Sequence, residues 1–284
     1  MLKGTAVLGS FLIFLREGIE GSLIITILCT LLAAAGRRDL FRWVFAGVGA
    51  ALLLAGAAGV ALFALSRSAF INSTAQTWFE TAVFLLAVVI LTYMTFWMKR
   101  NSRSMRSVLG TQVHLAIAGD SALPLALLAF VTVGREAIET VIFLLAIAFQ
   151  STVVSLLGGA VTGLLVSLAL SLAIYRVGLR LNYKRFFTVV GAALMVVAAG
   201  LLANAVRNLQ DLHVLPGGGH ALWDVNFVLS DASTLGDILH GLVGYAAAPT
   251  ALQVGTWALF LTLGLAAFFS RSRGQAVSGR SAAA

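Results

Sequence analysis

Arg16-Glu17-Gly18-Ile19-Glu20 and Arg135-Glu136-Ala137-Ile138-Glu139 are two copies of one charged pattern, Arg-Glu-x-Ile-Glu, at an offset of 119 residues. Both stretches lie inside long apolar runs. A charged side chain at the centre of a membrane helix costs roughly 2.5–3.5 kcal/mol, so charges at such positions usually serve a function. A single copy of the pattern would be weak evidence. Two copies of the same pattern predict an internal repeat.

The apolar runs around the two copies have the length of membrane spans. Of the 284 residues, 60% are hydrophobic and only 11% are charged, which excludes an ordinary soluble domain. About 20 apolar residues cross a hydrocarbon core of about 30 Å as a helix. The sequence therefore predicts an all-α polytopic membrane protein with seven transmembrane helices, near residues 8–34, 43–65, 78–98, 121–148, 153–175, 187–206 and 251–269.

The basic residues predict how these helices are oriented. Fourteen of the nineteen lysines and arginines fall in alternate connections and in the C-terminal tail. The positive-inside rule assigns those segments to the cytoplasm, which places the N-terminus outside and the C-terminus inside the cell membrane. The same distribution explains the net charge of +8 without a nucleic-acid partner.

The orientation makes the internal repeat an inverted one. The first helix runs inward and the fourth runs outward, so the two copies have opposite directions, as in many transporters whose site lies near the midplane. We expect a first three-helix repeat at residues 1–110, a second at 111–207, an extracytoplasmic loop at 208–250, and a seventh helix with a cytoplasmic tail at 251–284. Residues 221–245 of the loop are apolar enough to lie against the bundle or the membrane interface as short helices.

The spacing of the charged residues predicts a cation site. Residues three and four apart share a helix face, so Glu17 and Glu20 point the same way and Arg16 reaches Glu20. Four carboxylates on two facing helices form an oxygen-rich cage suited to hard cations. We expect the ligands to be Glu17, Glu20, Glu136, Glu139 and Glu80, supported by the cations Arg16 and Arg135, with five glutamates and two arginines leaving three negative charges.

Two other functions also use buried carboxylates. A membrane di-iron oxidase builds its site from Glu-x-x-His pairs, whereas this chain has Glu-x-x-Glu. A proton-coupled transporter of another substrate does not need two copies of one carboxylate pair. In the outer loop, Asp237 and His240 are three residues apart and form a candidate outer capture pair for cations.

Leu15-Arg16-Glu17-Gly18-Ile19-Glu20 resembles the Arg-Glu-x-x-Glu signature of the oxidase-dependent iron permeases, which include the yeast-type high-affinity iron permease and bacterial EfeU-type iron transporters. Arg135–Glu139 resembles the second signature. Residues Phe79-Glu80 through Met98 resemble the third block of the family, and the likeness extends over almost the whole chain. Ala137 and Thr81 stand where the family commonly has glycine.

The resemblance implies an iron permease, not an enzyme, that moves iron ions across the cytoplasmic membrane into the cell. Iron would be the transported substrate, with no permanently bound cofactor and the lipid bilayer as surroundings. Glu17, Glu20, Glu136 and Glu139 would be the translocating carboxylates. The resemblance also implies partnership with periplasmic iron-handling proteins, one of them a haem-containing peroxidase. The resemblance does not decide whether the transported ion is ferric iron, ferrous iron or another metal such as lead. It also does not decide whether the protein is a carrier or a channel.

Overall fold

Long apolar helices make up most of the protein. The computed structural model describes residues 4–69, 74–101, 122–149, 153–177, 183–217, 220–230, 233, 236, 239 and 244–281. The helices in these ranges are α1 Gly4–Ala34, α2 Phe41–Ala69, α3 Thr74–Asn101, α5 Leu123–Ala148, α6 Val153–Val177, α7 Tyr183–Asp211 and α9 Ala251–Ser281, with a 3-10 turn η1 at Arg38–Leu40. Within the described residues, one long helix lies at each of the seven predicted spans, which confirms the prediction of a helical membrane protein.

Among the residues that the structure describes, five segments are long and apolar enough to cross a membrane. They are Arg38–Leu65, Thr74–Met98, Val153–Ala173, Thr188–Asp211 and Ala251–Ser270. The two helices outside this set, α1 and α5, carry the charged motifs. Leucines on α2 and α9 such as Leu53 and Leu263 are exposed, as expected of side chains that face lipid. The chain is therefore a multi-pass helical membrane protein.

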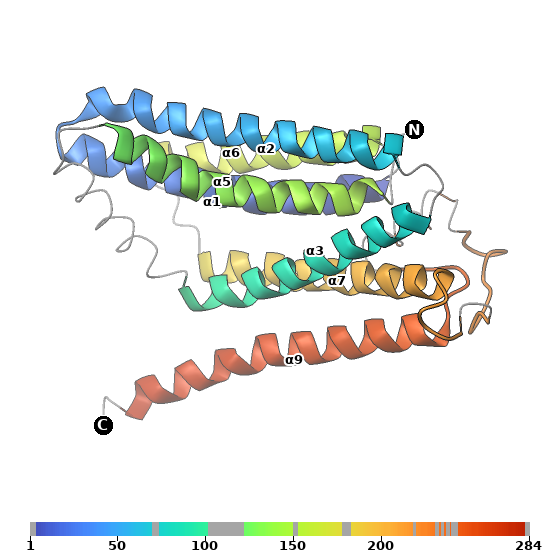
Figure 1. Cartoon of the computed structure of the whole chain (residues 1–284). Coiled ribbons are helices and arrows are strands. Elements are labelled where there is room, and N and C mark those ends of the chain that lie inside the picture. Colours follow the sequence, from blue (N-terminus) through green and yellow to red (C-terminus); the bar gives the residue numbers. More distant parts are fainter. Residues whose placement is uncertain are drawn as a thin grey trace.

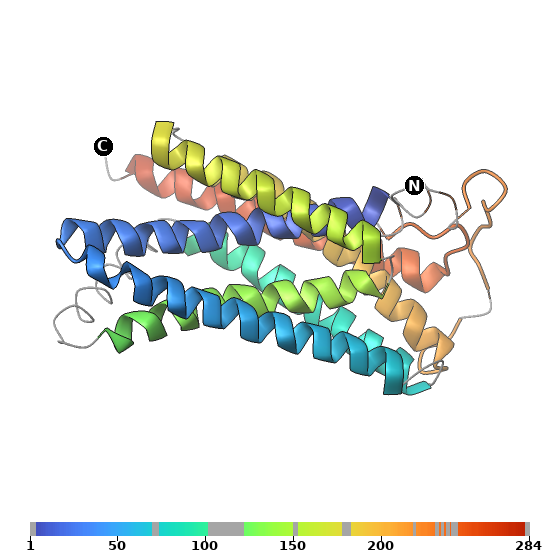
Figure 2. The ribbon, with the colours of Figure 1, turned by 90° about the horizontal axis from the view of Figure 1, so that it is seen from above.

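The helices form two layers (Figure 1). The first contains α2, α5, α1 and α6 in that order, each in contact with the next, and the view from above shows them side by side (Figure 2). The second contains α3, α7 and α9. Contacts of α3 with α5 and of α7 with α1 join the layers. The two helices with the charged motifs consequently lie together in the middle of the first layer, with α3 and α7 on one side.

Consecutive helices run in opposite directions along the bundle. The chain starts at one end and finishes at the other, and α1 and α5 are antiparallel to each other (Figure 1). The turn between α1 and α2 is tight because Gly36 adopts a left-handed φ of 73°. The amides of Gly36 and Arg37 then donate to the carbonyls of Ala33 and Leu32, which closes the helix and sends α2 back along the bundle.

The packing of α2 on α5 depends on a glycine. A Cβ atom at Gly47 would lie 2.2 Å from the backbone oxygen of Ala126 on α5. Small residues allow membrane helices to approach this closely. Close contact with α2 fixes the position of α5 and therefore of its charged motif.

The expectation of short helices in residues 221–245 is wrong for the part from Ala221 to Ser230. This part forms turns and an isolated bridge between Ala221 and Thr250. The amides of Leu222 and Val225 donate to the carbonyls of Pro249 and Ala247 at 2.7 and 2.9 Å. Pairing with the extended chain before α9 thus replaces the hydrogen bonds within a helix.

Candidate functional site

Three carboxylates meet between α1 and α5. Glu17, Glu20 and Glu136 each offer an oxygen, and these atoms all lie within 4.8 Å of one another. The three residues are only 6, 1 and 8% exposed. Like charges repel strongly in such a poorly solvated place, so a cation among these oxygens would relieve the repulsion. The arrangement has the chemistry of a site for a hard metal ion.

Arg16 pairs with this cluster from its own helix. Its Nε donates to Oε1 of Glu20 at 2.8 Å, and its Nη1 lies 3.6 Å from Oε1 of Glu17. Both oxygens of Glu17 are buried without a hydrogen-bond partner in the described part of the chain. When all groups are ionised, the three carboxylates and Arg16 carry a net charge of −2. That charge matches one divalent cation.

The second motif repeats the same pairing in a more open setting. Nε of Arg135 donates to Oε1 of Glu139 at 3.0 Å, and Oε2 of Glu139 is buried without a hydrogen-bond partner among the described residues. The Arg135 side chain is 43% exposed, whereas that of Arg16 is 2% exposed. Identical motifs therefore have different surroundings.

Two cavities reach the glutamates from different sides. One, of about 390 Å³, has walls from α1, α2, α5 and α6, and it touches Glu17 and Glu136. The other, of about 720 Å³, lies between α2, α3 and α5, and it touches Arg135 and Glu139. The carboxylates are thus buried by the helices, but cavities border them on two sides.

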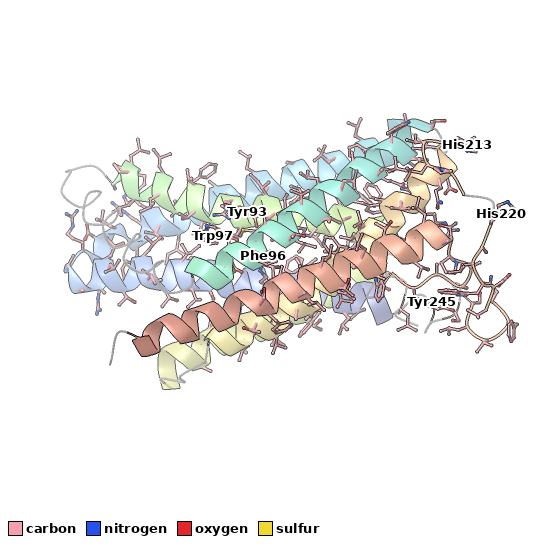
Figure 3. The ribbon with its side chains drawn as sticks, turned by 90° about the horizontal axis from the view of Figure 1, so that it is seen from below. Tyr93, Phe96, Trp97, His213, His220 and Tyr245 are labelled. Carbon is pink, nitrogen blue, oxygen red and sulfur yellow. The ribbon has the colours of Figure 1, made fainter. Side chains whose placement is uncertain are left out.

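Helix α3 contacts both motif arginines. The sulfur of Met98 accepts a hydrogen bond from Nη2 of Arg16, and the sulfur of Met94 accepts one from Nη2 of Arg135. Trp97, labelled in Figure 3, has its ring 5.1 Å from Cζ of Arg135. Sequence reasoning did not assign these residues a role. Their spacing of three and four on one helix face, beside an otherwise apolar run, was the available signal.

Comparison with known proteins identifies the family. The sequence model described as "Iron permease FTR1 family" matches residues 7–272. The chain belongs to this family. The proteins of Shigella sonnei (strain Ss046) and Escherichia coli O157:H7 are both named "Ferrous iron permease EfeU", and each is 34% identical over 281 residues, or 96% of this chain and 99% of the relative. The Yersinia pestis protein of the same name is 34% identical over an alignment of 288 positions, which covers 96% of this chain and 97% of that relative. No solved structure matches the chain.

Membership in the FTR1 family confirms the resemblance read from the two motifs. The family and these relatives are named as permeases, which supports iron transport and confirms the expectation of a transporter rather than an enzyme. The family names say nothing about which residues carry the ion. That assignment depends on the geometry above.

The other predicted ligands of this FTR1-family permease lie apart from the cluster or outside the described chain. Glu80 is half-buried on α3, accepts a hydrogen bond from Nε2 of Gln76 at 2.8 Å, and is not in the three-carboxylate group. Asp237 and His240 lie outside the described residues. His213 and His220 lie at one end of the bundle, far from Trp97 on α3 (Figure 3).

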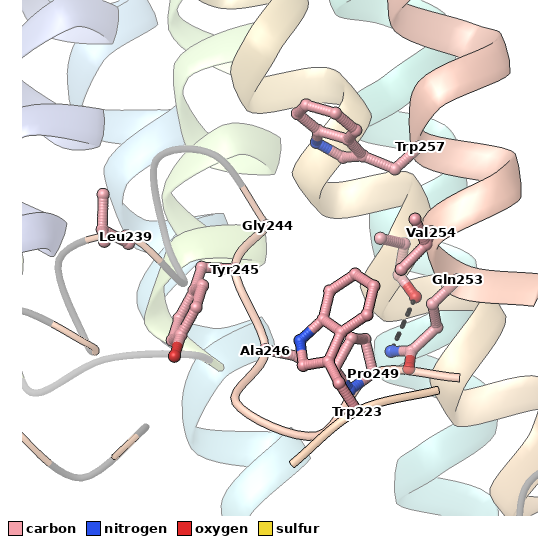
Figure 4. A pocket seen from close by; sticks show the side chains of 10 residues that line it. Trp223, Leu239, Gly244, Tyr245, Ala246, Pro249, Gln253, Val254 and Trp257 are labelled. Carbon is pink, nitrogen blue, oxygen red and sulfur yellow. Dashed lines mark hydrogen bonds between the residues drawn. The ribbon is translucent and has the colours of Figure 1, made fainter. Parts of the chain in front are cut away.

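A third cavity, of about 330 Å³, lies near the start of α9 (Figure 4). Its walls include Trp223, Tyr245 and Trp257, and Gln253 donates to the carbonyl of Ala203 beside it. None of the described residues that line it is acidic.

Proposed function

We propose that this permease moves iron ions across the cytoplasmic membrane into the cell and that the paired Arg-Glu-x-x-Glu motifs bind the ion on its way. The observation that carries the proposal is the buried group of Glu17, Glu20 and Glu136, whose oxygens lie within 4.8 Å of one another. Carboxylate oxygens are suitable ligands for a hard cation. The names of the relatives as ferrous iron permeases, together with the net charge of −2, support Fe(II) as the transported form.

The two glutamates of each motif have different tasks in this proposal. Glu17 and Glu136 touch the same cavity, so they are the pair that first meets an ion arriving there. Glu20 and Glu139 are each held by an arginine through one oxygen, which fixes their orientation while another oxygen stays available. An ion would pass between these carboxylates by exchanging one oxygen ligand for the next.

The same proposal includes two inverted repeats, α1–α3 and α5–α7, with α9 as an added helix. If the halves are related, α1 corresponds to α5, α2 to α6 and α3 to α7, and each contact between helices should have a counterpart. The contact of α1 with α6 then corresponds to that of α5 with α2, and the contact of α3 with α5 corresponds to that of α7 with α1. All four contacts are present. This reciprocity supports a division into two related halves. In the proposal the repeats have the limits 1–110 and 111–207, with residues 208–250 as the extracytoplasmic loop and 251–284 as the last helix and tail.

In a membrane, this arrangement has seven spans, because α1 and α5, which carry the charged motifs, cross together with the five candidate segments. The antiparallel course of α1 and α5 supports opposite orientation of the two motifs (Figure 1). The N-terminus would lie outside and the C-terminus in the cytoplasm. The proposed periplasmic iron-handling partners, including a haem peroxidase, would deliver iron to the outer end, where the loop before α9 lies.

Metal uptake into proteoliposomes tests the function directly. The purified protein is offered Fe(II), Fe(III), Mn(II), Zn(II) and Pb(II) in parallel, with empty liposomes as the control. We expect saturable uptake of iron, with Fe(II) transported more efficiently than Fe(III). Movement of another metal in preference to iron would contradict the proposed substrate, and no metal movement at all would contradict the proposed function.

A further inference from the structure

Two methionines of α3 occupy equivalent positions toward the two motif arginines. The distance from Nη2 of Arg16 to the sulfur of Met98 is 3.7 Å, and that from Nη2 of Arg135 to the sulfur of Met94 is 2.7 Å. Met94 and Met98 are 1 and 3% exposed and, being four residues apart, lie on one face of α3. A single helix therefore contacts the guanidinium groups of both halves.

In both motifs the nitrogen atoms of the arginine have the same kinds of partner. In both motifs Nε donates to Oε1 of the glutamate four residues later, and Nη2 points to a thioether. A guanidinium often binds a carboxylate in a bidentate pair, with two parallel N–H donors that occupy both carboxylate oxygens. Here the pairing is through one oxygen, and Oε2 of Glu139 has no hydrogen-bond partner among the described residues.

The type of acceptor matters for a cation site. The thioether of methionine is a weak, neutral acceptor, so it can engage an N–H group without adding a further charge. Trp97 adds a second contact of α3 with Arg135 through its ring, and this contact also leaves the carboxylate oxygens unoccupied.

We infer that Met94 and Met98 are positioning residues of the iron site. Their sulfur atoms accept hydrogen bonds from Nη2 of Arg135 and Arg16. Each arginine therefore orients its glutamate through one carboxylate oxygen, and the second carboxylate oxygen stays available to the ion. This inference rests on the proposed function, because the oxygens kept available are those proposed to bind iron. Loss of either sulfur would let the arginine turn toward the carboxylates and compete with the ion.

The test compares leucine with glutamine at each position. Met94→Leu and Met98→Leu keep an apolar side chain of similar volume but remove the acceptor, whereas Met94→Gln and Met98→Gln place an amide oxygen at similar reach. Residues that orient metal ligands typically affect metal affinity by about 10–100-fold, so we expect each leucine variant to raise the half-saturating iron concentration at least about tenfold. The glutamine variants should stay close to the wild type.

A packing role predicts the opposite order, since leucine preserves a buried apolar contact better than glutamine does. Met195→Leu on α7 is the matched control, because Met195 is equally buried and lies against Gly264 of α9. Membrane abundance is measured for every variant. If a leucine variant does not accumulate in the membrane, the glutamine variant at the same position decides. A half-saturating iron concentration equal to that of the wild type supports the inference, and a tenfold higher concentration overturns it.

The outcomes separate this inference from the proposed function. Leucine variants with wild-type half-saturation, beside a wild-type protein that takes up iron, overturn the positioning role and leave iron transport standing. A wild-type protein that carries no iron overturns the proposed function and the inference with it.

Discussion

At the scale of single residues, the carboxylates of the first motif are buried without enough partners. Both oxygens of Glu17 lack a hydrogen bond among the described residues although the side chain is 5% exposed. Such a group is costly inside a membrane protein. A cation that binds and leaves can supply the missing partner during transport, whereas a permanent structural role would favour a paired group.

Replacement of a core glutamate by glutamine tests this directly. Glu17→Gln, Glu20→Gln, Glu136→Gln and Glu139→Gln keep the shape of the side chain but remove the charge that a hard cation needs. We expect each variant to reduce iron uptake at least about tenfold, because even outer residues of metal sites affect affinity by about that factor. Uptake is measured against protein abundance in the membrane. Glu80→Gln should be intermediate, because Glu80 is outside the three-carboxylate group. Wild-type uptake by all four core variants would exclude the glutamate mechanism.

The two arginines should differ in their sensitivity to lysine. A lysine cannot reproduce the planar group that contacts a carboxylate at one edge and a sulfur at another. Arg16 is 2% exposed, whereas the side chain of Arg135 is 43% exposed beside a cavity, where water can replace part of a lost contact. We expect Arg16→Lys to reduce both iron uptake and the amount of folded protein more than Arg135→Lys. Equal losses of iron uptake and of folded protein in the two variants would indicate that burial of the arginine does not set its sensitivity to lysine.

At the scale of helices, the contact between α2 and α5 should be sensitive to one methyl group. Gly47→Ala places a Cβ atom 2.2 Å from the backbone oxygen of Ala126, and backbone cannot move aside as a side chain can. Overpacking of this kind typically costs about 1–3 kcal/mol, so the midpoint of thermal unfolding should fall. Gly49→Ala is the matched control on the same helix, because no described heavy atom beyond its chain neighbours and the nearby backbone of α2 lies within 4 Å of its added Cβ. Equal midpoints for the two variants would contradict the close approach of α2 and α5.

At the scale of the whole molecule, the distribution of basic residues predicts the side on which each connection lies. A reporter fused after Arg106 should be cytoplasmic, and one fused after Pro216 should be outside. Enzymatic reporters that are active on only one side of the membrane measure this. The two fusion points are separated by three long helices, α5, α6 and α7, so opposite results are expected. Reversed results would overturn the proposed orientation, and equal results would contradict the number of spans between the two points.

The sequence by itself determined the number of long helices, the membrane class and the pairing of arginine with glutamate inside each motif. These properties are local: apolar length sets a span, and residues four apart on a helix meet wherever the helix is placed. The family was readable as well, since the same motifs carry it. Charge and spacing predicted five glutamate ligands, because spacing along the chain cannot say which of them face a common point.

Only the tertiary structure decided how the motifs are combined. The antiparallel packing of α1 against α5 joins Glu17 and Glu20 with Glu136, and α3 brings Met94 and Met98 to the two arginines. It also buries Arg16 and leaves Arg135 beside a cavity, although the two motifs share the pattern Arg-Glu-x-Ile-Glu. The physical reason is that burial and contacts between helices depend on the neighbours that each face meets, and those neighbours lie tens of residues away along the chain.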